Sequence, residues 1–374
     1  MNSKYFIIAG ESSGDLHGSH LMHEMQILNP KINFQGIGGN LMAQKGLKSI
    51  VDINEMNVMG FIEVIKKYSF FKSVQKKSLE IIEKDSFDGI ILIDYPGFNL
   101  RLAKKIKEKN PQTPIHYYIS PQIWAWKEER LKIIKDYVDQ MIVIFEFEQK
   151  WYLKRGVSTK FVGHPFLDIY KNFEKDKVKL ELGLDTNKKH IALFPGSRIQ
   201  EIQKHLPIML RALNDKFFTD FDFLIGQARD LDTKSLSKFD LSRVRIIKDS
   251  PEKALAASDF AWVGSGTSTL QSVMFNTPFI LLYKTSYLSW LLMKRFVKVK
   301  YAGMPNIILN EDLIPELLQK NLTSEKIINE TKRFFNDNNY KKRLMSGYKK
   351  IINELGRPGA SLRAAKNIIE YSKN

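Results

Sequence analysis

The sequence predicts an α/β protein with two Rossmann-like domains facing each other across a cleft. Three observations lead to this fold class. Short apolar segments alternate with lysine-rich helical segments, glycine-containing loops follow the apolar segments, and the alternation starts twice, near residues 5 and 190. The 374 residues are also long for one domain and sufficient for two.

Five segments of the first half are predicted as parallel strands buried on both faces. They are YFIIAG (5–10), NFQGIGG, DGIILID (88–94), IHYYIS and QMIVIF (140–145). The first helix is predicted at HGSHLMHEMQIL (17–28). We assign residues 1–170 to this domain.

A charged stretch without strand character, residues 164–190, leads into a second set of strands. These strands are HIALF, FDFLIG, VRIIK, DFAWVG and PFILLY. We assign residues 171–340 to this second domain. The last segment, residues 341–374, reads as helical only, and we expect it to pack back on the first domain or to be exchanged in a dimer. The chain is expected to be a monomer or a homodimer.

Composition narrows the classes of partner. With 58 Lys+Arg and 41 Asp+Glu, the net charge is +17, which favours anionic lipid, phosphorylated substrates or nucleic acid. A generally lysine-rich surface explains the charge equally well. Because no nucleic-acid-binding module is found, a nucleic-acid partner is not expected. The absence of cysteine excludes disulfides and cysteine-bound metals. The N-terminus does not read as a signal peptide, and no apolar stretch is long enough to span a membrane.

Ligands of open α/β sheets bind at the loops that follow the strands. PGSR (195–198) follows the first strand of the second domain and precedes a helix, so its N–H groups favour an anion. Gly196 permits close approach, Ser197 can cap the helix, and Arg198 offers a fork suited to a diphosphate, with Glu201 nearby. The alternative is an ordinary turn with a surface arginine.

GSGTST (264–269) repeats this arrangement and forms a second candidate phosphate or ribose loop. Neither loop matches the patterns of P-loop ATPases or dinucleotide enzymes. The candidate donor-binding residues of this loop are Gly264, Ser265, Gly266, Thr267 and Ser268.

The loops of the first domain carry carboxylates instead. AGESSGD (9–15) holds Glu11 and Asp15, which would repel a diphosphate and suit sugar hydroxyls or acid/base chemistry. Asp94 ends a buried strand, where it can accept a proton from an attacking hydroxyl or simply cap the next helix. We therefore assign donor phosphates to the second domain and a hydroxyl-bearing partner to the first.

Metal sites and cofactors are not expected. His17, His20 and His23 have helical spacing but no carboxylate to complete a metal site. The Asp-x-Asp patterns at 219–223 and 230–232 lie at a strand start and in a charged loop.

Residues 58–77 mix aromatic and aliphatic side chains with lysines, as interfacial membrane segments do. A helix packed on its own core would show the same pattern. Residues 289–301 have a similar composition. The candidate membrane contacts are Phe61, Ile62, Val64, Ile65, Phe70 and Phe71.

Taken in order, these loops resemble the lipid-A-disaccharide synthase family. The matching stretches span residues 7 to about 319. They are AGESSGDLHG, GIGG, NVMGFIEV, IDYPGFN, HYYISPQIWAW, FVGHP, LFPGSRIQEI, SDFAWVGSGTSTLQ, and YAGMPNIIL followed by PELLQ.

The resemblance implies a GT-B fold and a metal-independent, inverting transfer. The donor would be UDP-2,3-diacylglucosamine and the acceptor 2,3-diacylglucosamine 1-phosphate (lipid X), giving a β-1,6-linked disaccharide phosphate and UDP in lipid A biosynthesis. It also implies a peripheral protein at an anionic membrane surface, the cytoplasmic face of the Gram-negative inner membrane.

The resemblance also implies roles for individual residues. Asp94 matches the proposed base and Arg198 the essential arginine near UDP. The acceptor side would comprise Glu11, Ser13, Asp94 and Asn99, with Glu11 also counted as catalytic, and Asn306 would lie on the donor side.

One departure concerns the donor site. Family members usually carry Glu where this chain has Gln271, which can still hydrogen-bond ribose hydroxyls but without charge. Two alternative functions remain open on sequence grounds. One is a UDP-N-acetylglucosamine 2-epimerase-like isomerase, and the other is a non-catalytic UDP-lipid-binding protein.

Overall fold

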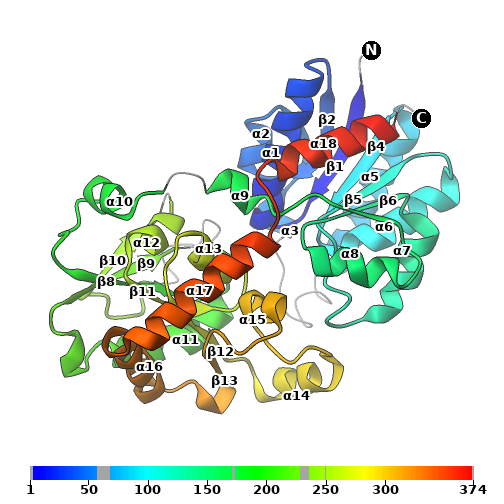
Figure 1. The fold of residues 1–374 in the computed structure, drawn as a ribbon. Coiled ribbons are helices and arrows are strands. Elements are labelled where there is room, and N and C mark those ends of the chain that lie inside the picture. The colour runs from blue at the N-terminus through cyan, green and yellow to red at the C-terminus, as the bar shows by residue number, and fades with distance from the viewer. Residues whose placement is uncertain (1–2, 57–67, 171–172, 228–235, 249, 373–374) are drawn as a thin grey trace. The chain divides into compact units, whose positions relative to one another are not determined.

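The computed structural model divides the chain into two compact units (Figure 1). Unit 1 comprises Met1–Asp168 and Leu355–Asn374, and unit 2 comprises Ile169–Glu354. The structure describes residues 3–56, 68–170, 173–227, 236–248 and 250–372.

Unit 1 is built on a seven-stranded sheet in the order β3-β2-β1-β4-β5-β6-β7, and all of its strand pairs are parallel. The strands are β1 (Lys4–Ala9), β2 (Asn33–Gly38), β3 (Leu47–Asp52), β4 (Gly89–Ile93), β5 (Ile115–Tyr118), β6 (Gln140–Val143) and β7 (Thr159–Phe161).

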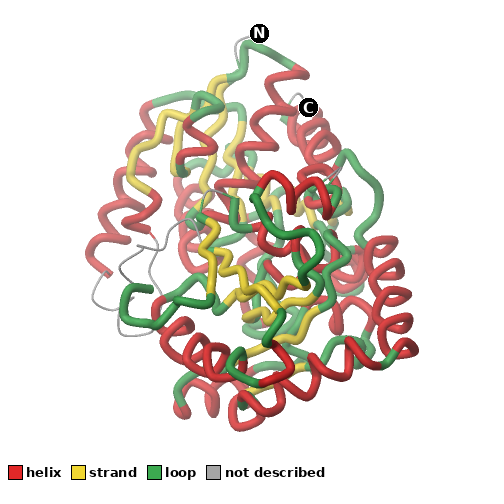
Figure 2. The backbone as a smooth tube through the Cα atoms, turned by 90° about the vertical axis from the view of Figure 1, so that its left-hand side faces the viewer, coloured by secondary structure: helices red, strands yellow, loops and turns green. Residues whose placement is uncertain are grey.

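Helices connect these strands and cover the sheet (Figures 1 and 2). The helices are α1 (Ser12–Leu28), α2 (Asn40–Ala43), α3 (Ile53–Met56), α5 (Tyr68–Lys84), α6 (Pro96–Lys109), α7 (Leu131–Tyr137), α8 (Glu146–Leu153), α9 (Phe166–Ile169) at the unit boundary, and the C-terminal α18 (Ala360–Tyr371).

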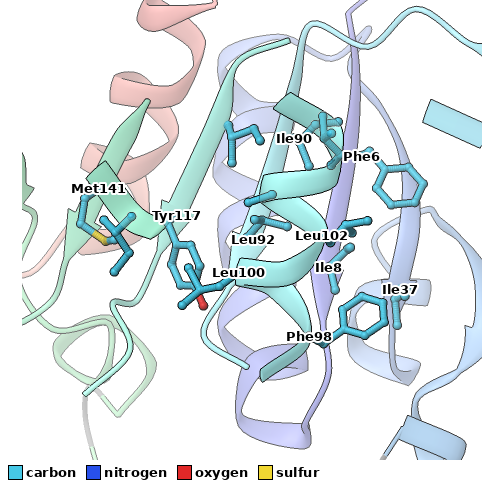
Figure 3. Close-up of a cluster of buried hydrophobic side chains, with 14 of the residues drawn as sticks. Phe6, Ile8, Ile37, Ile90, Leu92, Phe98, Leu100, Leu102, Tyr117 and Met141 are labelled. Atoms are coloured by element: carbon cyan, nitrogen blue, oxygen red, sulfur yellow. The ribbon is translucent and has the colours of Figure 1, made fainter. Parts of the chain in front are cut away.

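The apolar core of unit 1 joins alternate residues of the central strands to α6 (Figure 3). Phe6 and Ile8 of β1 lie beside Ile90 and Leu92 of β4, and all four side chains are fully buried. Side chains on the opposite face meet α1, because Gly18 of that helix approaches Ile93 closely. Burial on both faces explains why these strands are continuously apolar.

Unit 2 repeats this architecture with a six-stranded parallel sheet in the order β10-β9-β8-β11-β12-β13. The strands are β8 (Lys189–Phe194), β9 (Phe221–Gly226), β10 (Val244–Ile247), β11 (Phe260–Gly264), β12 (Phe279–Tyr283) and β13 (Glu316–Leu318). The helices are α10 (Lys175–Glu181), α11 (Ile199–Ala212), α12 (Glu252–Ala257), α13 (Ser268–Met274), α14 (Tyr287–Phe296), α15 (Met304–Leu309), α16 (Ser324–Asn336) and α17 (Asn338–Glu354).

The strand order reverses at one place in each sheet, between β1 and β4 in unit 1 and between β8 and β11 in unit 2. Connections on the two sides of such a point leave in opposite directions, and a crevice opens where they part. The loops after β1 and β4 therefore meet in unit 1, and the loops after β8 and β11 meet in unit 2.

The helical tail is divided between the two units. α17 belongs to unit 2, whereas α18 packs against α1 in unit 1. Arg363 of α18 donates from Nε and Nη2 to the carbonyl oxygen of Val162, at 2.9 and 2.6 Å. These bonds tie the C-terminal helix to the segment that leads out of unit 1. An exchange of this segment in a dimer stays a prediction.

Candidate functional site

Two acidic residues follow the adjacent strands β1 and β4 at the reversal point of unit 1. The register pairs Ala9 with Ile93, so Glu11 and Asp94 leave the same edge of the sheet one or two residues later. The two loops touch, because a Cβ atom at Gly10 would lie 2.4 Å from the Tyr95 ring. The loops that carry Glu11 and Asp94 therefore come together within unit 1.

Asp94 has an unusual backbone conformation. Its φ is 41°, and that of the next residue, Tyr95, is 48°, so two consecutive side-chain-bearing residues are left-handed. Each such residue costs roughly 1–3 kcal/mol, and strain of this kind concentrates at functional sites. The carbonyl oxygen of Asp94 accepts from Tyr117 Oη at 2.5 Å and from Asn99 Nδ2 at 2.7 Å, which holds the strained turn in place.

The pKa of the Asp94 carboxyl group is shifted toward neutral pH. Burial, followed by the negative charge of Glu11, raises its pKa to about 7. A general base is most effective when its pKa lies near the working pH. The arrangement is therefore suited to accepting a proton from a substrate hydroxyl.

Of the other residues expected on the acceptor side, Asn99 has a structural role that the sequence did not reveal. Asn99 is fully buried and its Nδ2 donates to the carbonyl oxygens of Ile93 and Asp94, so its amide group shapes the loop. Ser13 is half-buried in the first turn of α1.

The structure contradicts the expectation that Asp15 serves a hydroxyl-bearing ligand or acid/base chemistry. It is buried, and its carboxylate accepts from the backbone N–H groups of Gly39, Leu41 and Met42 at 2.8, 3.0 and 3.0 Å. Asp15 therefore caps α2 from α1 and fixes the GIGG loop. Of the two carboxylates in the opening loop, Glu11 alone stays a candidate for chemistry.

The sequence analysis missed another buried carboxyl group in unit 1, that of Glu148 on α8. Its Oε1 accepts from Trp124 Nε1 at 3.0 Å, which anchors the SPQIWAW loop. Burial, and to a smaller extent the charge of Asp94, raises the pKa of Glu148 to about 7 against the lowering effect of the hydrogen bond from Trp124. No sequence pattern distinguishes this residue from its surface neighbour Glu146, because both lie in the first turn of α8.

In unit 2 the PGSR and GSGTST loops meet as expected. The register pairs Phe194 with Val263, and a Cβ atom at Gly264 would lie 3.1 Å from the Phe194 carbonyl oxygen and 3.4 Å from Gly196 N. Gly196 has φ +122°, and a Cβ atom there would also meet the Glu201 side chain. A side chain at either glycine would disturb the junction of the loops.

Arg198 is the cation of this junction. It is the N-cap residue of α11, its side chain is 44% exposed, and its Nη1 lies 3.3 Å from Glu201 Oε1. A half-exposed ion pair contributes little to stability, so the guanidinium group can exchange Glu201 for an anionic ligand at low cost. Burial raises the pKa of Glu201, and Arg198 partly offsets that rise.

The hydroxyls of the GSGTST loop are not equivalent. Thr267 is exposed, and Ser265 and Ser268 are half-buried. Thr269 is buried and donates to the carbonyl oxygen of Gly266, which has φ +137°. The more accessible hydroxyls are therefore those of Ser265, Thr267 and Ser268, and their contact with the donor stays a prediction.

Gln271 is held by its own unit. Its Nε2 donates to Tyr170 Oη at 2.5 Å, and the side chain is half-buried in α13. The amide oxygen is the part of Gln271 that can accept from a sugar hydroxyl.

Asn306 also differs from the expectation of a direct donor contact. It is fully buried, and its Nδ2 donates to Ile314 O and Glu316 Oε1 while its Oδ1 accepts from Leu313 N and Ile314 N. Both amide hydrogens and both acceptor positions are used. Asn306 therefore organises the loop before β13 and has no hydrogen-bonding capacity left for a ligand.

Four of the candidate membrane contacts, Phe61, Ile62, Val64 and Ile65, lie outside the described residues. Phe70 and Phe71 begin α5, where both are half-buried against the core, and the ring of Phe71 lies 6.5 Å from that of Phe98. These two side chains therefore pack partly against the core of unit 1.

A family model described as lipid-A-disaccharide synthetase matches residues 5–368. Relatives named lipid-A-disaccharide synthase include a Syntrophus aciditrophicus protein, 38% identical over 376 residues, with 98% of this chain and 97% of the relative covered. Another, from Coxiella burnetii, is 33% identical over 370 residues, with 98% of each covered.

Similar solved structures include a UDP-GlcNAc 2-epimerase from Neisseria meningitidis bound to UDP-GlcNAc. It has a TM-score of 0.68 at 13% identity and covers 98% of this chain and 100% of that one. The calicheamicin glycosyltransferase CalG4 has a TM-score of 0.60 at 12% identity, covering 100% and 99%. At these identities the likeness concerns the fold alone, and it confirms the predicted class of two Rossmann-like α/β domains.

Proposed function

Because the chain belongs to the lipid-A-disaccharide synthase family, we propose that it transfers a diacylglucosamine unit from UDP-2,3-diacylglucosamine to lipid X. The observation that carries this proposal is the match over residues 5–368, with relatives at 33–38% identity over 97–98% of their length. The products are the β-1,6-linked disaccharide 1-phosphate and UDP.

Asp94 is the general base of this proposal. As the acceptor 6-hydroxyl oxygen bonds to the anomeric carbon of the donor, the carboxylate takes the hydroxyl proton. The bond from the anomeric carbon to the UDP oxygen breaks, and its electron pair leaves with UDP. A single displacement of this kind inverts the anomeric configuration. The pKa of about 7 and the strained turn at Asp94 support this role.

Unit 2 binds the donor in this proposal. Arg198 and the N–H groups at the start of α11 offset the charge that develops on the departing diphosphate. The hydroxyls of Thr267 and Ser268 and the amide oxygen of Gln271 are available for the remaining polar groups of UDP, whereas Ser265 Oγ donates to the carbonyl oxygen of Ala302 at 3.4 Å. Fixed positive charge at the leaving group performs the task that a divalent ion performs in metal-dependent transferases.

An anionic membrane surface is the proposed working environment, at the cytoplasmic face of the inner membrane. Among the described residues no helix is long and apolar enough to cross a bilayer. α14 nevertheless exposes Tyr287, Leu291 and Phe296, at 81%, 53% and 58% of their surface. Residues 284–310 contain five cations and no acidic residue. Apolar side chains beside cations favour contact with anionic lipid.

The epimerase alternative rests on the fold alone, because the similar structures named as UDP-N-acetylglucosamine 2-epimerases are 12–13% identical. The non-catalytic alternative is disfavoured by the tuned carboxyl group of Asp94 and by the exposed guanidinium group of Arg198.

One assay separates the three functions. Purified protein is incubated with UDP-2,3-diacylglucosamine and lipid X in detergent micelles containing EDTA, and the products are identified by mass spectrometry. Parallel samples receive UDP-N-acetylglucosamine alone. We expect disaccharide 1-phosphate and UDP in the first sample and no epimer in the second. Epimer formation, or donor binding without any product, would contradict the proposal.

A further inference from the structure

His205 joins two loops of unit 2 that the sequence analysis treated separately. It lies in the second turn of α11 and is 1% exposed. Its Nδ1 lies 2.6 Å from the carbonyl oxygen of Pro195, and its Nε2 lies 2.8 Å from the backbone nitrogen of Lys284. Helical side chains lean toward the N-terminus of their helix, so a residue at this position reaches back to the PGSR loop.

The two partners determine the state of the ring. The Pro195 carbonyl can only accept a hydrogen bond, so Nδ1 must carry a proton. The Lys284 N–H can only donate, so Nε2 must be unprotonated. His205 is therefore neutral and present as a single tautomer. Both of its nitrogens are used by backbone groups of the protein.

The bridge crosses a strand. Pro195 follows β8 and Lys284 follows β12, and the sheet order places β11 between these strands. The loop that follows β11 is GSGTST, the second candidate donor loop. The His205 ring thus connects the loops that follow β8 and β12, and the GSGTST loop emerges between them from the end of β11.

The bond to Pro195 also fixes the direction of the Gly196 N–H group. The carbonyl of Pro195 and the N–H of Gly196 belong to one planar trans peptide and point in opposite directions. Because the Pro195 carbonyl points toward His205, the Gly196 N–H points away from His205. Gly196 has φ +122° and no side chain, so little else in the residue restrains this peptide.

We propose that His205 is a positioning residue for donor binding, which holds the PGSR loop in its diphosphate-binding conformation by bridging Pro195 and Lys284. It touches no substrate itself. The inference rests on the proposed assignment of the donor diphosphate to unit 2. It adds to that assignment a residue that sets the orientation of the loop.

Three variants and one control test this role. His205→Leu removes both hydrogen bonds, whereas His205→Asn keeps a donor near the position of Nδ1 and can preserve the bond to Pro195. His190→Leu is the matched control, because His190 is equally buried in unit 2 but lies near the amino end of β8, away from both loops. His205→Gln places an acceptor near the position of Nε2 and tests the bond to Lys284.

The readouts are the Kd of UDP by calorimetry, the KM of the donor and of lipid X, kcat, and the thermal midpoint. We expect His205→Leu to raise the Kd of UDP and the donor KM about tenfold, the equivalent of losing one net hydrogen bond, with a much smaller change in the lipid X KM. His205→Asn should recover most of that loss. His190→Leu should leave the Kd of UDP unchanged.

Unchanged UDP affinity in His205→Leu, or an equal loss in His190→Leu, would overturn the positioning role. Calorimetry does not depend on turnover, so it separates this inference from the proposed reaction. A wild type that binds UDP in a His205-dependent way but forms no disaccharide would support the inference and contradict the reaction. A wild type that does not bind UDP would overturn the inference together with the donor assignment.

Discussion

Asp94 combines a strained backbone with a carboxyl group whose pKa is raised to about 7. The base form is the ionised one, so kcat/KM should rise with pH and level off above about 7. Glu11→Gln removes a negative neighbour that raises this pKa, so the acidic limb of the profile should move to lower pH. Initial rates between pH 5 and 9 measure the shift.

The matched control for that profile is Glu80→Gln, an exposed position on α5. The acidic limb of the kcat/KM profile of Glu80→Gln should coincide with that of the wild type. A Glu11→Gln profile that keeps its midpoint, or moves it to higher pH, would contradict the coupling between the two carboxyl groups.

Glu148 makes a prediction about stability. Its folded pKa of about 7 exceeds its ordinary value of 4.5, so its contribution to stability is fully present below pH 4.5 and is lost as pH rises through 7. Glu148→Gln keeps an acceptor for Trp124 but cannot ionise. At pH 8 it should be more stable than the wild type by about 2–3 kcal/mol. At pH 5 the difference should be much smaller.

Urea unfolding at the two pH values measures this difference, with the exposed Glu108→Gln as control. Equal destabilisation by Glu148→Gln at both pH values would mean that the carboxyl group is ionised and required.

At the scale of elements, Asp15 fastens α1 to α2. Asp15→Ala leaves three buried or half-buried N–H groups without their acceptor and should lower the free energy of unfolding by about 2–3 kcal/mol. Asp15→Asn retains one acceptor oxygen and should fall in between. Urea denaturation ranks the three proteins. An Asp15→Ala variant as stable as the wild type would contradict the capping role.

The same elements show what the sequence could and could not predict. β1, β4, β8 and β11 were predictable because strands buried on both faces are continuously apolar. β7 and β13 were missed because each has only three residues, and β3, which has six, was missed because several of its residues are exposed.

Side-chain roles were harder to predict than strands. The loops around Glu11, Asp94 and Arg198 were predictable, because parallel strands deliver their following loops to one edge. The internal hydrogen bonds of Asp15, Asn99 and Asn306 were not, since a polar residue after a strand has the same composition whether it faces ligand or backbone. Glu148 and His205 gave no signal, because their partners are distant in sequence.

For the whole molecule, the net charge of +17 and the exposed face of α14 lead to a prediction about lipid. The double variant Leu291→Ser with Phe296→Ser should bind vesicles containing phosphatidylglycerol about tenfold more weakly than the wild type. Leu180→Ser, at a position 69% exposed on α10, should bind as the wild type does. Vesicle sedimentation at constant ionic strength measures all three, and equal binding would remove α14 from the membrane contact.

The central claim is that unit 1 supplies the general base and unit 2 binds the donor. Asp94→Asn tests this claim most directly. The change removes the base in unit 1 and leaves the donor loops of unit 2 intact. The account predicts that kcat for disaccharide formation falls by roughly 10²–10⁴-fold while the Kd of UDP stays at the wild-type value. Turnover within a few-fold of the wild type, or a parallel loss of UDP affinity, would contradict it.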